Sequence, residues 1–219
     1  EDTDIYELEA SPHDAGTVYV AASRYRTAND FLPYLWKSSD YGTTWVNMSA
    51  SFPQSEITRT IREDTVRKGL LFAGTETGLF ISFDDGNSWK RFNLNLPAVP
   101  VHDMKIKGED LCIATFGRSF WILDDISPLR QWDEQYKGET SHLFKPRDHT
   151  RLGINWWSLY GGGIGGGQKN YFVQNGRMGL TFYELGMVNG ERKRNYIDAG
   201  GARPYGAIIH YWLGEDAKD

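Results

Sequence analysis

The sequence predicts an all-β fold, and three observations support that class. Aromatic residues make up 14% of the 219 residues, and there are 24 glycines. No long helical period stands out, whereas several short runs alternate between apolar and polar residues as strands do. The third observation is a repeat, because the pattern Ser-x-Asp-x-Gly-x-(Ser/Thr)-Trp occurs at residues 38–45 and again at 82–89.

Each of these two stretches, the first octapeptide (38–45) and the second octapeptide (82–89), predicts a tight turn closed by an aromatic ring. The aspartate can accept hydrogen bonds from backbone N–H groups shortly after it, and the glycine permits a positive φ. The tryptophan then carries its large ring as a wedge between neighbouring sheets. The residues with these structural roles are Ser38, Asp40, Gly42, Thr44 and Trp45 in the first octapeptide, and Ser82, Asp84, Gly86, Ser88 and Trp89 in the second.

The spacing of the repeats predicts three sheets of similar build. The aspartates of the two octapeptides lie 84 − 40 = 44 residues apart. Segment 71–85 also aligns without gaps onto 111–125, at an offset of 40 that places Phe80 on Phe120 and Asp84 on Asp124. We therefore expect sheets at about 4–48, 56–92 and 101–126. The third lacks the glycine and tryptophan of an octapeptide, so we expect the chain to leave the repeats there.

These motifs resemble the Asp-box, or bacterial neuraminidase repeat, of β-propellers. Residues 10–14, 68–78 and 117–125 are similar to large secreted bacterial proteins described as sortilin-like or glycosyl-hydrolase-like. The resemblance is specific over about residues 4–130. It implies a partial β-propeller of about three four-stranded blades, and a secreted, periplasmic or cell-surface location.

The chain is expected to divide into three parts. Residues 1–130 would hold the last blades of the propeller, and 131–200 would form a connector with a glycine-rich loop at 161–167. Residues 201–219 would supply the first strand of a β-sandwich-like domain. Because propellers typically need about four to eight blades, we expect a fragment or subunit whose remaining blades come from the same polypeptide or another chain.

Candidate ligand-binding residues are expected at the end of the blades opposite the octapeptides. That end receives the loops between second and third strands and the start of the third blade's inner strand. Arginine, carboxylate and histidine side chains there suit an anionic or sugar ligand; the alternative is a satisfied polar ring around a water-filled channel. The residues predicted to form this face are Arg24, Arg26, Asp30, Glu76, His102 and Arg118.

Three functions remain open from the sequence. A protein- or glycan-binding scaffold is favoured by the resemblance. A glycoside hydrolase of sialidase-like or glucanase-like type is the second, with Glu76 and Asp103 as the one nominated pair of catalytic carboxylates; sialidases instead use a tyrosine nucleophile and an arginine cluster. The third is a structural subunit of an extracellular assembly, completed by strands of another chain.

Composition argues against several other classes. The net charge of −5 provides no electrostatic footprint for nucleic acid. No apolar run approaches membrane-spanning length. The glycine-rich loop lacks the Gly-Lys-(Ser/Thr) ending of a phosphate-binding loop, and Asp84-Asp85 lacks the spaced oxygen ligands of a calcium loop. We expect neither a metal nor a cofactor.

Overall fold

The computed structural model describes residues 3–149, 173–174, 178–179, 182–188, 191–196 and 207–214. The chain forms two compact units, Glu1–Gln135 and Tyr136–Asp219. The first unit consists of three antiparallel sheets, here called blades 1 to 3. This arrangement confirms the predicted all-β class and the partial β-propeller.

Blades 1 and 2 each contain four strands in sequential order. The helix α1 (Tyr25–Ala28) lies between the second and third strands of blade 1. Blade 1 comprises β1 (Asp4–Ala10), β2 (Val18–Arg24), β3 (Asp30–Ser38) and β4 (Val46–Asn47). Blade 2 comprises β5 (Thr58–Glu63), β6 (Leu71–Thr75), β7 (Leu79–Ser82) and β8 (Lys90–Arg91).

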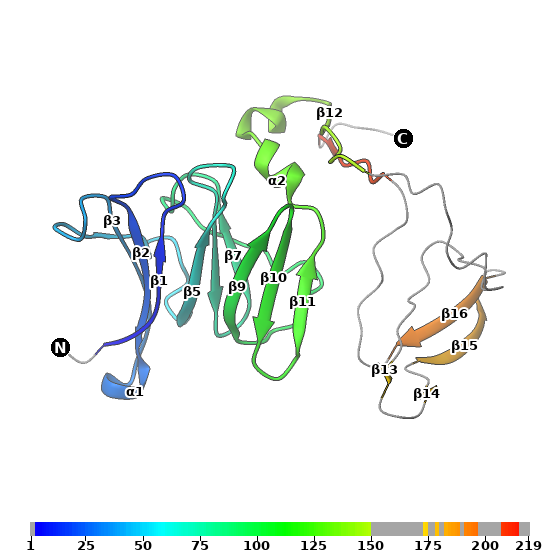
Figure 1. The fold of residues 1–219 in the computed structure, drawn as a ribbon, viewed down its shortest axis with the longest axis horizontal. Coiled ribbons are helices and arrows are strands. Elements are labelled where there is room, and N and C mark those ends of the chain that lie inside the picture. The colour runs from blue at the N-terminus through cyan, green and yellow to red at the C-terminus, as the bar shows by residue number, and fades with distance from the viewer. Residues whose placement is uncertain are drawn as a thin grey trace. The chain divides into compact units, whose positions relative to one another are not determined.

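Blade 3 has three strands, β9 (Val101–Lys107), β10 (Asp110–Thr115) and β11 (Phe120–Leu123), and is followed by the helix α2 (Ser127–Gln131). The chain therefore leaves the repeat where the octapeptide degenerates. Figure 1 shows β1, β5 and β9 side by side, with α1 and the β10–β11 loop at one end of the blades and α2 at the other. The blades thus have two distinct ends.

Two apolar clusters join the blades, and blade 2 contributes a different face to each. The large apolar residues of its strands β5 to β7 each have 2% or less of their surface exposed. The cluster between blades 1 and 2 includes Tyr19, Leu35, Met48, Phe52, Ile61, Leu71, Phe80 and Trp89. The cluster that joins blades 2 and 3 includes Phe72, Leu79, Ile81, Met104, Ile106, Leu111 and Ile113.

The tryptophans of the two octapeptides have different surroundings in this structure. Trp89 is 6% exposed, its indole Nε1 donates to the Met48 carbonyl at 3.0 Å, and its ring lies 5.1 Å from that of Phe52. Trp89 thus packs against the blade that precedes its own. Trp45 is 43% exposed and its indole Nε1 donates to the carbonyl of Gly42, in its own turn. Among the described residues, no blade precedes blade 1 to cover it.

The ungapped alignment of blades 2 and 3 is wrong by one residue in the third strand. Ala73 pairs with Phe80, whereas its counterpart Ile113 pairs with Trp121. The loop before β11 is one residue longer than the loop before β7. Because neighbouring strand residues face opposite sides, Trp121 packs on the core while Phe120 is 79% exposed. In strand position, Phe80 therefore corresponds to Trp121, and Asp84 no longer aligns with Asp124.

In the second unit, β12 (Ser141–Leu143) pairs antiparallel with β17 (Tyr211–Leu213). The other described strands form two hairpins, β13 (Val173–Gln174) with β14 (Met178–Gly179) and β15 (Phe182–Val188) with β16 (Glu191–Tyr196). The predicted glycine-rich loop 161–167 lies outside the described residues. The predicted domain boundaries stay predictions. In the part of the chain that the structure describes, no helix is long and apolar enough to cross a membrane.

Candidate functional site

Each innermost strand carries a β-bulge near the α1 end of the blades. The bulged residues, skipped by the pairing with the neighbouring strand, are Tyr6 in β1, Arg59 in β5 and His102 in β9. In blades 2 and 3 the bulge occupies the same place in the strand pairing, next to the residue that pairs with Thr75 or Thr115. In blade 1 it lies one residue pair further from the end of the strand. Bulges re-aim a side chain and are frequent next to active sites. The repeat therefore presents Tyr6, Arg59 and His102 at one end.

Arg59 is the centre of this region. Its side chain is 9% exposed, and its Nε donates to Glu76 Oε2 at 2.7 Å. Its guanidinium carbon lies 4.8 Å from the ring centroid of Tyr6 and 5.4 Å from that of Tyr25. A guanidinium held between two aromatic rings and a carboxylate is fixed in orientation.

The helix α1 adds a second guanidinium beside Tyr25. Arg26 Nε donates to the Tyr25 hydroxyl at 2.7 Å, and the guanidinium also lies over the Tyr25 ring, 5.6 Å from its centroid. This hydrogen bond from Arg26, followed by that from Arg59, lowers the pKa of Tyr25 from 10.0. Both cations favour the phenolate because they stabilise its negative charge.

Arg24, at the end of β2, completes the region. Its Nη1 lies 3.7 Å from Asp30 Oδ2, while its buried Nε has no hydrogen-bond partner. The hydrogen bond from the Tyr34 hydroxyl, and then that from the Leu32 amide, lowers the pKa of Asp30. We call the following set the arginine–tyrosine cluster: Tyr6, Arg24, Tyr25, Arg26, Asp30, Arg59 and Glu76. Its three arginines and two carboxylates give +3 − 2 = +1, whereas the whole chain has a net charge of −5.

The cluster unites four of the six predicted face residues, and the other two lie outside it. His102 stacks on Phe116, with ring centroids 5.3 Å apart. Arg118 lies in the β10–β11 loop, where its carbonyl accepts a hydrogen bond from Trp121 Nε1.

The nominated catalytic carboxylates are held by different arginines. Glu76 accepts from Arg59, while Asp103 accepts from Arg62 Nη2 at 2.8 Å. Arg62 also forms ion pairs with Glu7 and Glu9 of blade 1. Burial, the largest influence, raises the pKa of Glu9, although Arg62 opposes it. A catalytic role for Glu76 and Asp103 stays a prediction.

Sequence reasoning missed Tyr6, Tyr25 and Arg59. Tyr25 lies between Arg24 and Arg26, both of which the sequence predicted to form the face. Arg59 lies 102 − 59 = 43 residues before His102. Comparing the inner strands position by position could therefore have indicated Arg59. The bulge that aligns it with His102 has no signal in the sequence.

In the octapeptides, at the opposite end, both carboxylate oxygens of each aspartate accept hydrogen bonds from local donors. Asp40 Oδ1 accepts from Thr44 N and Ser38 Oγ, both at 2.8 Å, and Oδ2 accepts from Thr44 Oγ1 at 2.6 Å. Asp84 accepts the equivalent bonds at 2.8, 2.8 and 2.5 Å, from the residues Ser88 and Ser82. The geometry matches that of a turn-capping side chain. Among the described residues, no group of three or more His, Cys, Asp or Glu side chains is placed to hold a metal ion.

The fold and site define a partial β-propeller with a cationic–aromatic cluster at one end. No protein-family model and no curated protein matches the chain. Among solved structures, it is similar to an ancestral GH74 enzyme (19% identity, TM-score 0.43, 52% of this chain and 14% of that chain). It is also similar to the GH74 xyloglucanase from Xanthomonas campestris, with 18% identity and a TM-score of 0.43, over 53% of this chain and 20% of that chain. A third similar structure is YCF48 bound to D1 peptide, with 14% identity and a TM-score of 0.42, over 57% of this chain and 38% of that chain. The chain thus spans a fifth or less of the two GH74 chains.

Proposed function

We propose that the first unit is a recognition module that binds an acidic carbohydrate at the arginine–tyrosine cluster. The observation that carries this proposal is the guanidinium of Arg59, fixed between Tyr6 and Tyr25 at a β-bulge. A positively charged cluster on an acidic chain attracts an anion locally without making the whole surface basic. Following the resemblance stated above, we propose a location outside the cytoplasm.

The cluster offers complementary groups for such a ligand. Arg26 is exposed, and Arg24 has a side chain that is 38% exposed, so both can turn guanidinium N–H groups toward a carboxylate. Guanidinium–carboxylate pairs can be bidentate, which fixes the orientation of the ligand. The ring of Tyr25 supplies an apolar face for the sugar, and its hydroxyl a polar edge.

Calorimetric titration of the full chain with an oligogalacturonate, beside a neutral galacto-oligosaccharide of equal length, tests this function. The acidic sugar is expected to bind, and its affinity to fall as salt is raised because the contacts are partly exposed. Arg26→Ala should weaken binding by about tenfold or more, the loss of one charge-assisted contact. The matched control Arg118→Ala removes a guanidinium at the same end but outside the cluster, and should change little. Equal binding of the neutral sugar, or equal losses in both variants, would contradict the proposal.

A second candidate, a glycosidase with a tyrosine nucleophile, is supported by one observation. Tyr25 has a lowered pKa, and Arg59 contacts both its ring and the carboxylate of Glu76. A lowered pKa activates a nucleophile. This activity predicts hydrolysis of aryl glycosides of acidic sugars that is abolished by Tyr25→Phe. If wild-type protein binds the sugar and releases no aryl alcohol, the recognition function stands alone.

We also propose that further blades pack on the outer faces of blades 1 and 3. The outward residues Phe120 and Ile122 of β11 are 79% and 59% exposed, whereas their counterparts in β7, Leu79 and Ile81, are each 2% exposed against blade 3. Apolar faces of this kind are usually covered. The partner would be another blade, from the same polypeptide or from another chain.

A further inference from the structure

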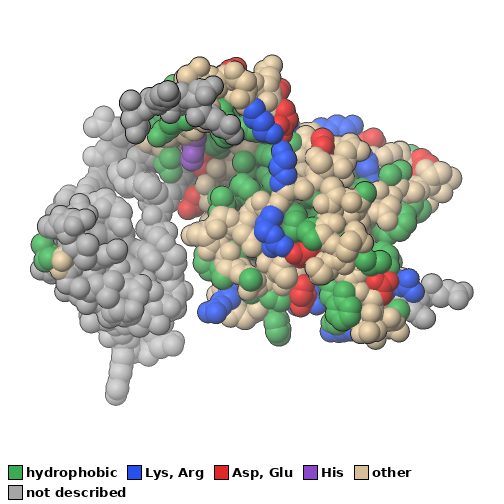
Figure 2. All heavy atoms as spheres, turned by 180° about the vertical axis from the view of Figure 1, so that it is seen from behind, with side chains coloured by type: hydrophobic (Ala, Val, Ile, Leu, Met, Phe, Trp, Pro, Cys, Tyr) green, Lys and Arg blue, Asp and Glu red, His purple; other side chains and the backbone are tan. Residues whose placement is uncertain are grey.

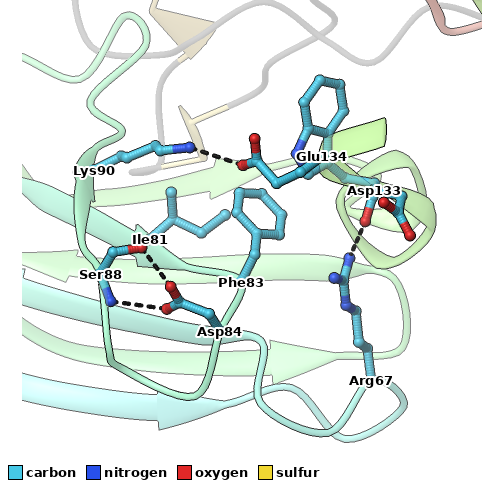
Figure 3. A pocket seen from close by; sticks show the side chains of 9 residues that line it. Arg67, Ile81, Phe83, Asp84, Ser88, Lys90, Asp133 and Glu134 are labelled. Carbon is cyan, nitrogen blue, oxygen red and sulfur yellow. Dashed lines mark hydrogen bonds and ion pairs between the residues drawn. The ribbon is translucent and has the colours of Figure 1, made fainter. Parts of the chain in front are cut away.

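A small cavity lies at the octapeptide end of blade 2, away from the arginine–tyrosine cluster and sharing no residue with it. Figure 3 shows its lining side chains. Its volume is about 190 Å³. Phe83, which follows β7, and Trp132, which follows α2, provide aromatic surface, and Lys90, Asp133 and Glu134 are among its polar lining residues.

The aromatic part of the cavity is held in place by hydrogen bonds. The rings of Phe83 and Trp132 lie 6.4 Å apart at an angle of 46°. Arg67 lies over Phe83, with its guanidinium carbon 5.3 Å from the ring centroid. Its Nη1 donates to the carbonyls of Leu129 at 2.8 Å and Trp132 at 2.6 Å. These bonds tie the segment after α2 to blade 2, so the two rings are positioned before any ligand arrives.

The polar lining groups offer both donors and acceptors. Lys90 Nζ lies 2.9 Å from Glu134 Oε1, and the two side chains are 53% and 55% exposed. Exposed ion pairs are weak, so these groups can exchange partners at little cost. Asp133 is exposed and adds a further carboxylate. Asp84, also exposed, already has its oxygens occupied by Ser82 and Ser88.

The geometry points to a site for a single neutral sugar ring. A volume below the roughly 300–1,000 Å³ of drug-sized sites suits one ring. The C–H face of a pyranose can lie on Phe83 and Trp132, while its hydroxyls donate to Glu134 or Asp133 and accept from Lys90. The lining holds three carboxylates against two cations, which disfavours an anionic ligand. The positive charge of Arg67, whose guanidinium carbon lies 5.3 Å from the Phe83 ring centroid, disfavours an organic cation beside the two rings.

Nuclear magnetic resonance of the full chain tests this site, with the indole N–H signal of Trp132 as the readout, identified by its loss in Trp132→Phe. Three ligands are titrated separately: methyl glucopyranoside, methyl glucuronide and choline. The neutral sugar should shift the signal with a Kd of about 1–10 mM, an ordinary affinity for one small ring. For the two charged ligands, the Kd measured from the same signal should be at least about fivefold higher.

Variants locate the effect. Glu134→Gln, which leaves the aromatic walls and the fold in place, should weaken sugar binding at this signal about threefold or more. Trp132→Ala should abolish sugar binding, which is then measured from the signals of the other residues that line the cavity. Trp45→Ala removes a half-exposed tryptophan of the other octapeptide and should leave the affinity unchanged. No shift by the neutral sugar, tighter binding of either charged ligand, or insensitivity to Glu134→Gln would overturn the inference. Failure of the acidic sugar at the arginine–tyrosine cluster would leave it standing.

Discussion

Gly86 and Gly108 both adopt positive φ, at +83° and +62°, yet their surroundings differ. A Cβ on Gly86 would meet Met48 Cε at 1.9 Å, in the cluster between blades 1 and 2, whereas a Cβ on Gly108 has nothing within 4 Å. A side chain at Gly86 would therefore have to displace the flexible end of Met48 as well as strain the backbone. This is the residue at which the turn chemistry and the blade packing depend on each other.

Replacing each of these glycines by alanine separates the two requirements. Gly108→Ala should cost only the backbone strain, about 1–2 kcal/mol in the free energy of unfolding. Gly86→Ala should cost that strain plus about 1–3 kcal/mol of overpacking. Urea unfolding measures both. Equal losses would show that the contact between Gly86 and Met48 does not constrain the fold.

The turn aspartates predict a pH dependence of stability. Hydrogen bonds from Thr44, and then from Ser38, lower the pKa of Asp40 from its ordinary value of 3.8. For Asp84, burial is the largest influence and raises the pKa, but the bonds from Ser88 and Ser82 together outweigh it, and the net shift is downward. A depressed folded-state pKa stabilises the protein above the unfolded value, and this stability is lost as pH falls through the folded value.

We therefore expect the midpoint of unfolding to fall as the pH is lowered below about 3.8. In the double variant Asp40→Asn, Asp84→Asn the same acid limb should be flatter, because neither side chain titrates. Thermal melts across the acid range compare the two proteins. Parallel pH profiles would mean that the octapeptide carboxylates are not the groups responsible.

The two octapeptides differ in what their tryptophans contact, although their turns share one hydrogen-bond pattern. Trp89 is covered by blade 1, while Trp45 is 43% exposed. Trp89→Ala should therefore cost about 3–5 kcal/mol of unfolding free energy, the usual result for a buried large aromatic residue. Trp45→Ala should cost well under half of that. Chemical unfolding of the two variants checks the difference, and similar costs would contradict the assignment of Trp89 as the contact between blades.

The sequence predicted the blades correctly because similar strand segments recur at a regular spacing and each octapeptide contains its own turn chemistry. It could not predict the bulges at Tyr6, Arg59 and His102, because a bulge depends on pairing with a strand distant in sequence. The extra residue before β11 was missed for a related reason. Without pairing information, the run after Arg118 reads equally well in either register, and the choice decides whether Phe120 or Trp121 is buried.

The candidate site, like the fold, could be predicted from the sequence only in part. Arg24, Arg26, Asp30 and Glu76 could be placed on one end from the expected connectivity of a blade. The contacts between the tyrosines and Arg59 could not, because they join β1, α1 and β5, which are brought together only by the packing of blade 1 on blade 2. Functional residues drawn from two blades are therefore visible only in the assembled unit.

Considered as a whole, the first unit has a mixed surface and two open apolar faces. On the side shown in Figure 2, basic and acidic side chains are interspersed over the coloured residues. Phe120 and Ile122, together with Ile5 and Leu8 of β1, are 59–79% exposed. Exposed apolar surface of this kind promotes association. Among the coloured residues on the visible side, no large patch of like charge is present to repel a second copy and oppose this association.

This surface predicts concentration-dependent self-association of the isolated chain. The double variant Phe120→Ser, Ile122→Lys should shift the equilibrium toward monomer, since it places a charge on the outer face of blade 3 and leaves the face toward blade 2 intact. Sedimentation velocity at several concentrations measures the distribution. A wild-type chain that stays monomeric at all concentrations would argue against blade packing on these faces.

The most direct test of the ligand face is a map of backbone amide chemical shifts during titration with oligogalacturonate. We predict that the largest changes fall on residues 6, 24–26, 59 and 76, with smaller changes at the β10–β11 loop. They should need about tenfold more ligand in Arg26→Ala, the loss of one charge-assisted contact, and should be unchanged in Arg118→Ala. Changes centred instead on the two octapeptides, or spread evenly over the blades, would contradict the claim that the bulged end of the inner strands recognises the ligand.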